Sequence, residues 1–156
     1  MTITIFSDAS HAHVKPVGSY AYWIEGPYGA VKESGAFTSP CQNATEAEIK
    51  AIANALAACL AAGWDDVQSI VVNCDSLPAM HLIQKGGKNK SPGAHYGALY
   101  CNYLIHGLQL KYGIPGISFR HIKAHSGRGD PRSLRNNWCD KEAKKELNKA
   151  LSQLRA

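Results

Sequence analysis

The order of the secondary-structure patterns constrains the fold of this chain more than any single motif does. Residues 2–7 alternate Thr and Ile, the period of two that is typical of a half-buried strand. Residues 17–25 and 30–38 have strand character too, and the turn sequence GPYG between them predicts an antiparallel meander. The remaining patterns predict helices at 45–62, 76–84, 94–111 and 134–154, and strands at 67–74 and 116–122. This order predicts an α/β fold with one mixed sheet flanked by helices.

Apolar residues recur at helical spacing in the longer helical segments and predict which side of each helix is buried. The expected inward positions are Ile52, Ala55, Leu56 and Cys59 in residues 45–62; Leu99, Tyr103, Leu104 and Leu108 in residues 94–111; and Cys139, Ala143, Leu147, Ala150, Leu151 and Leu154 in the last helix.

The size and composition favour one globular domain over residues 1–156. No apolar stretch reaches the roughly 20 residues of a membrane span, and the N-terminus lacks the pattern of a signal peptide, so we expect a cytoplasmic protein. The five cysteines include no C-x-x-C pair, which favours buried free thiols over a zinc site or disulfides. Nothing in the sequence requires an oligomer, and a monomer is expected.

The net charge of +5 is distributed unevenly along the chain. Residues 1–110 carry six Lys and Arg against eight Asp and Glu, whereas residues 111–156 carry eleven against four. A basic C-terminal third beside a group of carboxylates suggests a polyanionic substrate that is held in one place and cut in another. The alternative is a lysine-rich helix face that is only solvated.

Four acidic residues lie in four separate segments, each at a position from which its side chain can reach a common point. Asp8 and Asp75 end two β-like runs, and the topology makes these strands neighbours. Glu48 lies on the inward side of the first helix, and Asp140 lies early in the last helix, on or beside its inward face. Converging carboxylates repel one another unless a cation neutralises them, and their hard oxygens suit Mg²⁺. Two such ions would activate a water and stabilise the leaving oxygen in an in-line displacement at phosphorus.

Each acid also has a simpler interpretation when taken alone. Asp8 is compatible with an ordinary turn residue at a strand end. Glu48 has the spacing of a capping box with Thr45, and Asp75 is placed to cap the next helix. Asp140 is compatible with a first-turn acid favoured by the helix dipole. Glu46, the acid nearest to Glu48, is expected to face solvent.

The histidines do not have zinc-binding spacing, but one of them lies in a suggestive loop. His125 precedes Ser126 and Gly127, about fifteen residues before Asp140. A histidine on a loop can titrate near neutral pH and move protons or help to release product. An exposed loop histidine without a role is the alternative, and His11 and His13 are interpreted mostly as surface residues.

Five stretches of the chain resemble ribonuclease H, the type 1 family with four catalytic carboxylates. They are IFSDAS, TEAEIKAIANAL, VVNCDS, HIKAHSG and NNWCDKEA, in the family's order and at closely similar spacings over nearly the whole chain. The resemblance implies a five-stranded mixed sheet in the order 3-2-1-4-5 with strand 2 antiparallel. It implies that Asp8, Glu48, Asp75 and Asp140 bind two Mg²⁺ ions, with Mn²⁺ as a substitute, and that His125 assists turnover. It also implies endonucleolytic cleavage of the RNA strand of RNA–DNA hybrids, which leaves 3′-hydroxyl and 5′-phosphate ends.

An enzyme that acts on hybrids must distinguish a 2′-hydroxyl from a 2′-hydrogen, and the wide, shallow minor groove allows this without reading bases. Short polar side chains suit that task, and lysines and arginines suit the phosphates. The expected groove contacts are Ser10, Asn43, Thr45 and Ser76; the expected phosphate contacts are Lys85, Lys88, Lys90, Lys123 and Arg128, together with Arg132 and Arg135. The family's Gly-Ser after the first aspartate is Ala9-Ser10 in this chain.

Two other functions are compatible with the same residues. One is a nuclease of the same fold that acts on DNA, such as a junction resolvase. The other is a nucleic-acid-binding protein without catalytic activity, which the presence of all four carboxylates disfavours.

Overall fold

The computed structural model describes residues 1–26, 28–123 and 129–155. Its elements are β1 (Thr2–His11), β2 (Gly18–Gly26), β3 (Gly29–Ala36), α1 (Ala44–Ala61), β4 (Ser69–Cys74), α2 (Leu77–Lys85), α3 (Pro92–Tyr112), β5 (Ser118–His121) and α4 (Pro131–Arg155). The strands form one sheet in the order β3-β2-β1-β4-β5. Strand β2 runs antiparallel to both β1 and β3, and β1, β4 and β5 run parallel. The predicted mixed sheet and its strand order are confirmed.

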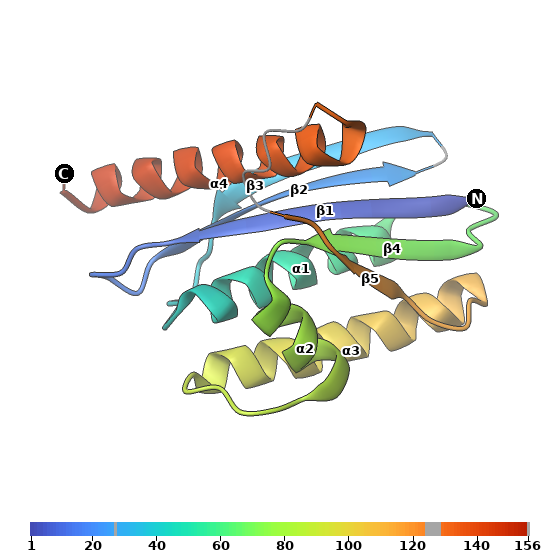
Figure 1. Cartoon of the computed structure of the whole chain (residues 1–156), viewed down its shortest axis with the longest axis horizontal. Helices are drawn as coiled ribbons and strands as arrows, with labels where there is room; N and C mark the ends of the chain where they lie inside the picture. The colour runs from blue at the N-terminus through green and yellow to red at the C-terminus, as the bar shows by residue number, and fades with distance from the viewer. Residues whose placement is uncertain (27, 124–128, 156) are drawn as a thin grey trace.

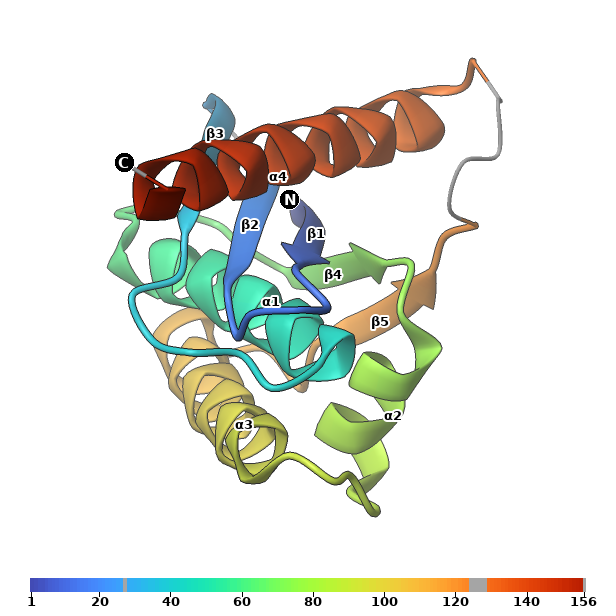
Figure 2. The same cartoon turned by 90° about the vertical axis from the view of Figure 1, so that its left-hand side faces the viewer.

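Helices cover both faces of this sheet (Figure 1). Turned by 90°, the molecule shows α4 on one face and α1 on the other, with α3 beyond α1 (Figure 2). Strand β1 contributes side chains to the apolar clusters on both faces of the sheet, because successive side chains of a strand point to opposite faces. Ile3 and Ile5 belong to the larger apolar cluster beside α1, whereas Phe6 packs with Cys139 and Ala143 of α4. Strand β1 is therefore buried on both sides, whereas its alternating sequence is typical of a half-buried strand.

Among the element boundaries that differ from the sequence prediction, two lie close to the acidic residues. Strand β1 continues past Asp8 because it pairs with β2 as far as His11, opposite Gly18. Helix α4 begins at Pro131, where proline suits a first helical turn. Asp130 caps this helix by accepting a hydrogen bond of 3.0 Å from the backbone N–H of Ser133.

The buried side of α3 differs from the prediction. Leu99 and Tyr103 were expected to face the core, but they are 66% and 72% exposed. The buried residues of α3 are Ala94, Ala98, Cys101, Leu104 and Leu108. Small residues face α1 because the two helices approach closely: a Cβ added at Gly97 would lie 2.9 Å from Cγ2 of Ile49. Leu104 and Leu108 confirm part of the prediction, but apolar spacing alone also selects the large side chains of Leu99 and Tyr103 in place of the small buried residues.

The other expected inward positions mostly lie in the core. Ile52, Ala55, Leu56 and Cys59 of α1 are buried, as are Cys139, Ala143 and Leu147 of α4. Leu154, which was expected to face inward, is 56% exposed. All five cysteines are free and buried, which confirms that prediction. Within the described residues, no helix combines the length and the apolar character that a membrane span requires.

Glu46 is buried, which contradicts the expectation that it faces solvent: only 1% of it is exposed. Its carboxylate accepts hydrogen bonds from the Ser91 hydroxyl and from the backbone N–H of Gln42, and it pairs with Nζ of Lys50 at 2.8 Å. Burial opposes ionisation, but the hydrogen bonds from Lys50 and Ser91 outweigh it and lower the pKa of Glu46. These contacts join the beginning of α1 to the beginning of α3.

Substituting Gly93 with Ala is expected to destabilise the protein by about 1–3 kcal/mol. A Cβ at this position would lie 2.5 Å from Oε1 of Glu46, and that carboxylate is held by its buried contacts. The matched control is Gly107→Ala in the same helix, where the Cβ would meet Leu60 at an ordinary 3.5 Å. The control is expected to gain about 0.5–1 kcal/mol from helix propensity. Urea unfolding measures both variants, and equal stability of the two would contradict the prediction.

Candidate active site

Sheet register sets Asp8 beside Asp75. The last pair between the parallel strands β1 and β4 joins Phe6 to Asn73. The same register continued by two residues places Asp8 opposite Asp75, which follows the end of β4. Asp8 itself does not end its strand, as the sequence suggested, because β1 continues beside β2. The strand that ends at this level is β4, and the carboxylates of Asp8 and Asp75 meet at the edge of the sheet where it ends.

Glu48 of α1 reaches the same edge from beneath the sheet. The backbone N–H of Ala9 donates to Oδ1 of Asp8 at 2.8 Å and to Oε1 of Glu48 at 3.2 Å. Ligand atoms of Glu48, Cys74 and Asp75 all lie within 4.8 Å of one another. The other two oxygens, Oδ2 of Asp8 and Oε2 of Glu48, are buried, and neither accepts a hydrogen bond from a described donor. These carboxyl groups can satisfy one another only by sharing a proton or by binding a cation.

Burial, together with crowding of the acids, raises the pKa values of Asp8 and Glu48. Burial, and then the charge of Asp75, raises the pKa of Asp8 from 3.8 to about 7. Burial, followed by the charges of Asp8 and Asp75, raises the pKa of Glu48 well above its usual range. The site without a cation therefore retains protons at pH values where exposed carboxyl groups have lost them.

Cys74 contributes a sulfur to this group but not an anionic one. Burial is the main cause that raises the pKa of its thiol well above the usual value, followed by the charge of Glu48. The backbone N–H of Ser76 donates to the Sγ atom at 3.3 Å. A neutral thiol is a poor metal ligand, so the donors of this site are carboxylate oxygens, which favour a hard cation over zinc.

Asp140 faces the site from α4. The neighbouring residue, Cys139, packs onto β1, and its thiol donates to the carbonyl of Phe6 at 3.6 Å. Asp140 contributes to the raised pKa of Asp8, and its Oδ2 atom lies 3.2 Å from Nζ of Lys144. It occupies the third turn of α4, nine residues after Pro131, so its interpretation as a first-turn acid is wrong.

The capping interpretations of the other acids are also wrong. Asn43 caps α1 by accepting a hydrogen bond from the backbone N–H of Glu46, so Glu48 and Thr45 form no capping box. Ser76 caps α2 through the backbone N–H of Ala79. Neither Glu48 nor Asp75 is therefore explained by local helix chemistry.

A family model for RNase H matches residues 1–148. The chain belongs to the RNase H family. This membership confirms the resemblance found in the sequence and the expectation of an enzyme of the ribonuclease H class.

Solved structures of RNase H1 proteins share the fold of this ribonuclease H. The RNase H1 of the halophilic archaeon Halobacterium salinarum is 17% identical, with a TM-score of 0.70 over 96% of this chain and 99% of that one. The N-terminal RNase H domain of Mycobacterium tuberculosis rv2228c is 16% identical, with a TM-score of 0.70 over 99% of each chain. LC11-RNase H1, isolated from compost, was solved in complex with an RNA/DNA hybrid; it is 19% identical, with a TM-score of 0.70 over 96% of this chain and 99% of that one. A search of curated proteins found no match.

The polar residues expected to contact nucleic acid lie on several elements around the site. Ser10 is in β1, Asn43 and Thr45 are at the beginning of α1, and Ser76 precedes α2. All four are half-buried. The side chain of Asn43 has a second partner, because its Nδ2 atom donates to Oδ1 of Asn89 at 3.2 Å.

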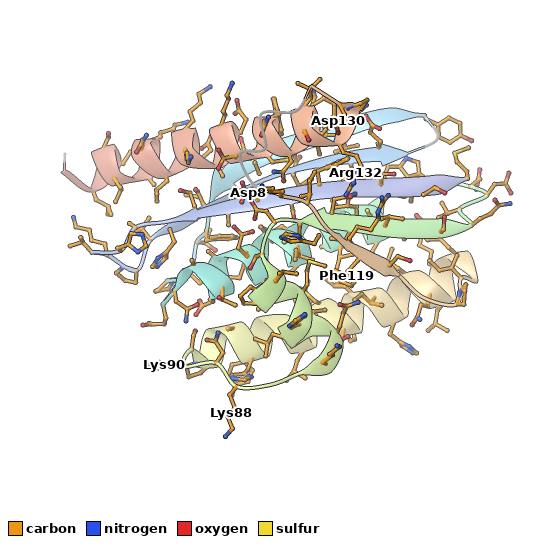
Figure 3. All side chains as sticks on the ribbon, in the orientation of Figure 1. Asp8, Lys88, Lys90, Phe119, Asp130 and Arg132 are labelled. Carbon is orange, nitrogen blue, oxygen red and sulfur yellow. The ribbon has the colours of Figure 1, made fainter. Side chains whose placement is uncertain are left out.

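The expected basic contacts of this ribonuclease H are more dispersed. Lys85, Lys88 and Lys90 are exposed on the last residue of α2 and the loop that follows it, and Lys123 is exposed after β5. Figure 3 shows Lys88 and Lys90 on this loop, away from Asp8. His125 and Arg128 lie outside the described residues.

Sequence reasoning missed how the two arginines at the beginning of α4 are bound. Arg135 pairs with the carboxylate of Glu25 and lies over the ring of Trp23, so its charge is partly neutralised. Arg132 instead donates to Asn73, a neutral residue of β4. No local signal in the sequence identifies either partner, since both lie on distant strands.

Proposed function

We propose that this ribonuclease H cleaves the RNA strand of RNA–DNA hybrids endonucleolytically, with Mg²⁺ as cofactor, and leaves 3′-hydroxyl and 5′-phosphate ends. One observation carries the proposal: Glu48 lies with Asp75 and shares the backbone N–H of Ala9 with Asp8, and buried carboxylate oxygens of Asp8 and Glu48 lack any described donor. Membership of the RNase H family supports the reaction class, and the hybrid complex of LC11-RNase H1 supports the substrate.

The residues present fit divalent metal ions. Asp8, Glu48, Asp75 and Asp140 would hold them, because these acids offer hard oxygens and only a cation relieves their mutual repulsion when all are ionised. Bound ions would supply an activated water and stabilise the charge that develops on the leaving oxygen.

The chain's own groups have separate tasks. The backbone N–H of Ala9 orients the carboxylates of Asp8 and Glu48 before any cation binds. Ser10, Asn43, Thr45 and Ser76 are proposed to contact the sugar edges of the hybrid, and the lysines and Arg128 its phosphates. His125 is proposed to assist proton transfer or product release.

A substrate panel tests the proposal. Labelled RNA–DNA hybrid, duplex DNA, duplex RNA and a four-way junction are incubated with the protein and Mg²⁺, Mn²⁺ or EDTA. We expect cleavage of the RNA strand of the hybrid alone, dependent on Mg²⁺ or Mn²⁺. Cleavage of the junction or of duplex DNA would favour a DNA nuclease of the same fold. Binding without cleavage of any substrate would favour a non-catalytic protein.

The single domain over residues 1–156 and the monomeric state remain proposals, and light scattering tests the monomeric state.

A further inference from the structure

Arg132 is held in a defined orientation by a buried amide. Its Nε and Nη2 atoms donate to Oδ1 of Asn73 at 3.2 and 3.0 Å. Asn73 is 1% exposed, and its Nδ2 atom donates to the carbonyl of Ile5 at 3.2 Å. That second bond fixes the amide, because a flipped amide would direct its NH₂ group at the guanidinium and its oxygen at a carbonyl.

The anchor orients the guanidinium without neutralising it. Two other cations of α4 have carboxylate partners: Arg135 pairs with Glu25, and Lys144 pairs with Asp140. Arg132 forms no such ion pair within the described residues, and its fixed bonds use two of the five guanidinium donors. The side chain is half-exposed. It therefore offers a full positive charge and free N–H donors to an anion that approaches from solvent.

The residue that anchors this charge is close in sequence to one of the carboxylates. Asn73 is two residues before Asp75, which follows the end of β4, and two residues of extended chain span about 7 Å. That separation is of the order of the spacing between successive phosphates in one nucleic-acid strand. On α4, Arg132, Asn136 and Asp140 follow one another at intervals of four residues and so share one side of the helix. Figure 3 shows Arg132 between the beginning of α4 and the sheet, with Asp8 further along β1.

We propose that Arg132, held by Asn73, binds the backbone phosphate of the cleaved strand adjacent to the one that is cut. This inference rests on the proposed function for the position of the cut. A phosphate suits the site because a planar guanidinium binds its oxygens through two parallel N–H donors. The neutral anchor keeps the cation oriented and charged beside a site whose carboxylates would otherwise repel the substrate.

Salt dependence of hybrid binding tests the contact. Arg132→Gln removes the charge but keeps an N–H donor within reach of Asn73, and Arg132→Lys keeps the charge but removes the planar fork. Lys149→Ala is the matched control, because it removes one charge from an exposed position near the other end of α4. All are made in the Asp75→Asn background, and binding is measured by fluorescence anisotropy in Mg²⁺ between 50 and 200 mM salt.

We expect Arg132→Gln to bind the hybrid roughly tenfold more weakly at 50 mM salt and to lower the slope of log K against log salt by about 0.9, the contribution of one phosphate. Arg132→Lys should keep the slope and lose part of the affinity. Lys149→Ala should change neither. A folded Arg132→Gln protein with unchanged slope and affinity overturns the proposal and leaves Arg132 as a purely structural link between α4 and β4.

A substrate modification locates the contact. One neutral methylphosphonate next to the cut in the RNA strand should weaken binding of the hybrid to the background protein. The same modification should not weaken binding to the Arg132→Gln protein further. This non-additivity identifies the pair that interacts. Additive losses at that position overturn the assignment to the adjacent phosphate. If the substrate panel shows that the protein binds another nucleic acid instead of the hybrid, the proposed function fails, and the same salt series on that nucleic acid still decides whether Arg132 binds a phosphate.

Discussion

Asp75→Asn is expected to lower kcat/KM for hybrid cleavage by roughly a thousandfold or more, about 4 kcal/mol of activation free energy, while hybrid binding persists. The substitution conserves the shape of the side chain but removes one negative charge from the group that it forms with Glu48 and Cys74. An amide oxygen is a weaker ligand for a hard cation than a carboxylate, and it leaves the charge of that cation less balanced. Binding should persist because phosphate contacts on other parts of the surface supply most of the affinity.

Asp65→Asn is the matched control for this experiment. Asp65 is exposed in the segment between α1 and β4, and the change removes the same charge. Cleavage should remain at the wild-type rate, measured under single-turnover conditions with saturating protein. Normal cleavage by Asp75→Asn would show that the acid cluster has been assigned the wrong role. Loss of binding together with cleavage would show that Asp75 contributes mainly to holding the substrate.

Much of this site follows from local patterns in the sequence. The apolar run before Asp75 predicts a central strand, and the alternating run before Asp8 predicts a strand beside it in a sheet built in this order. The apolar alternation also fixes the register, because a slip of one residue would turn Ile3 and Ile5 away from α1. Acids that follow these apolar runs are thus brought together by the same hydrophobic pattern that forms the core.

Other parts of the site depend on contacts that no local pattern encodes. Glu46 and Glu48 are two residues apart and so point to different sides of α1, but periodicity does not determine which of them meets other acids. The answer depends on Ser91 and Gly93, distant in sequence, which surround the carboxylate of Glu46. The bond between Arg132 and Asn73 joins residues 59 positions apart, and it too depends on tertiary packing.

The raised pKa values predict how the stability of the protein without metal depends on pH. Below the ordinary pKa of 3.8, Asp8 is protonated in both the folded and the unfolded chain, so it does not affect stability. As the pH rises from there to about 7, the unfolded chain releases this proton while the folded chain retains it. The free energy of unfolding therefore falls across this window. For a shift of about three units, the loss is on the order of 4 kcal/mol.

Magnesium is expected to offset part of this loss, and to do so only where the acids can ionise. A cation must displace the proton of Asp8, whose pKa is raised to about 7, so this proton competes with it strongly at pH 5 and much less at pH 8. At a Mg²⁺ concentration 100-fold above the dissociation constant, binding adds about 2.7 kcal/mol, or roughly 6–10 °C in Tm for a chain of this size. Thermal unfolding in Mg²⁺ and in EDTA should give this difference at pH 8 and little at pH 5. The titration of groups outside the site affects Tm equally in Mg²⁺ and in EDTA, so it cancels in the comparison. The Asp75→Asn variant should show a smaller Tm difference at pH 8. An equal Tm shift at both pH values would mean that Mg²⁺ binds elsewhere than among these carboxylates.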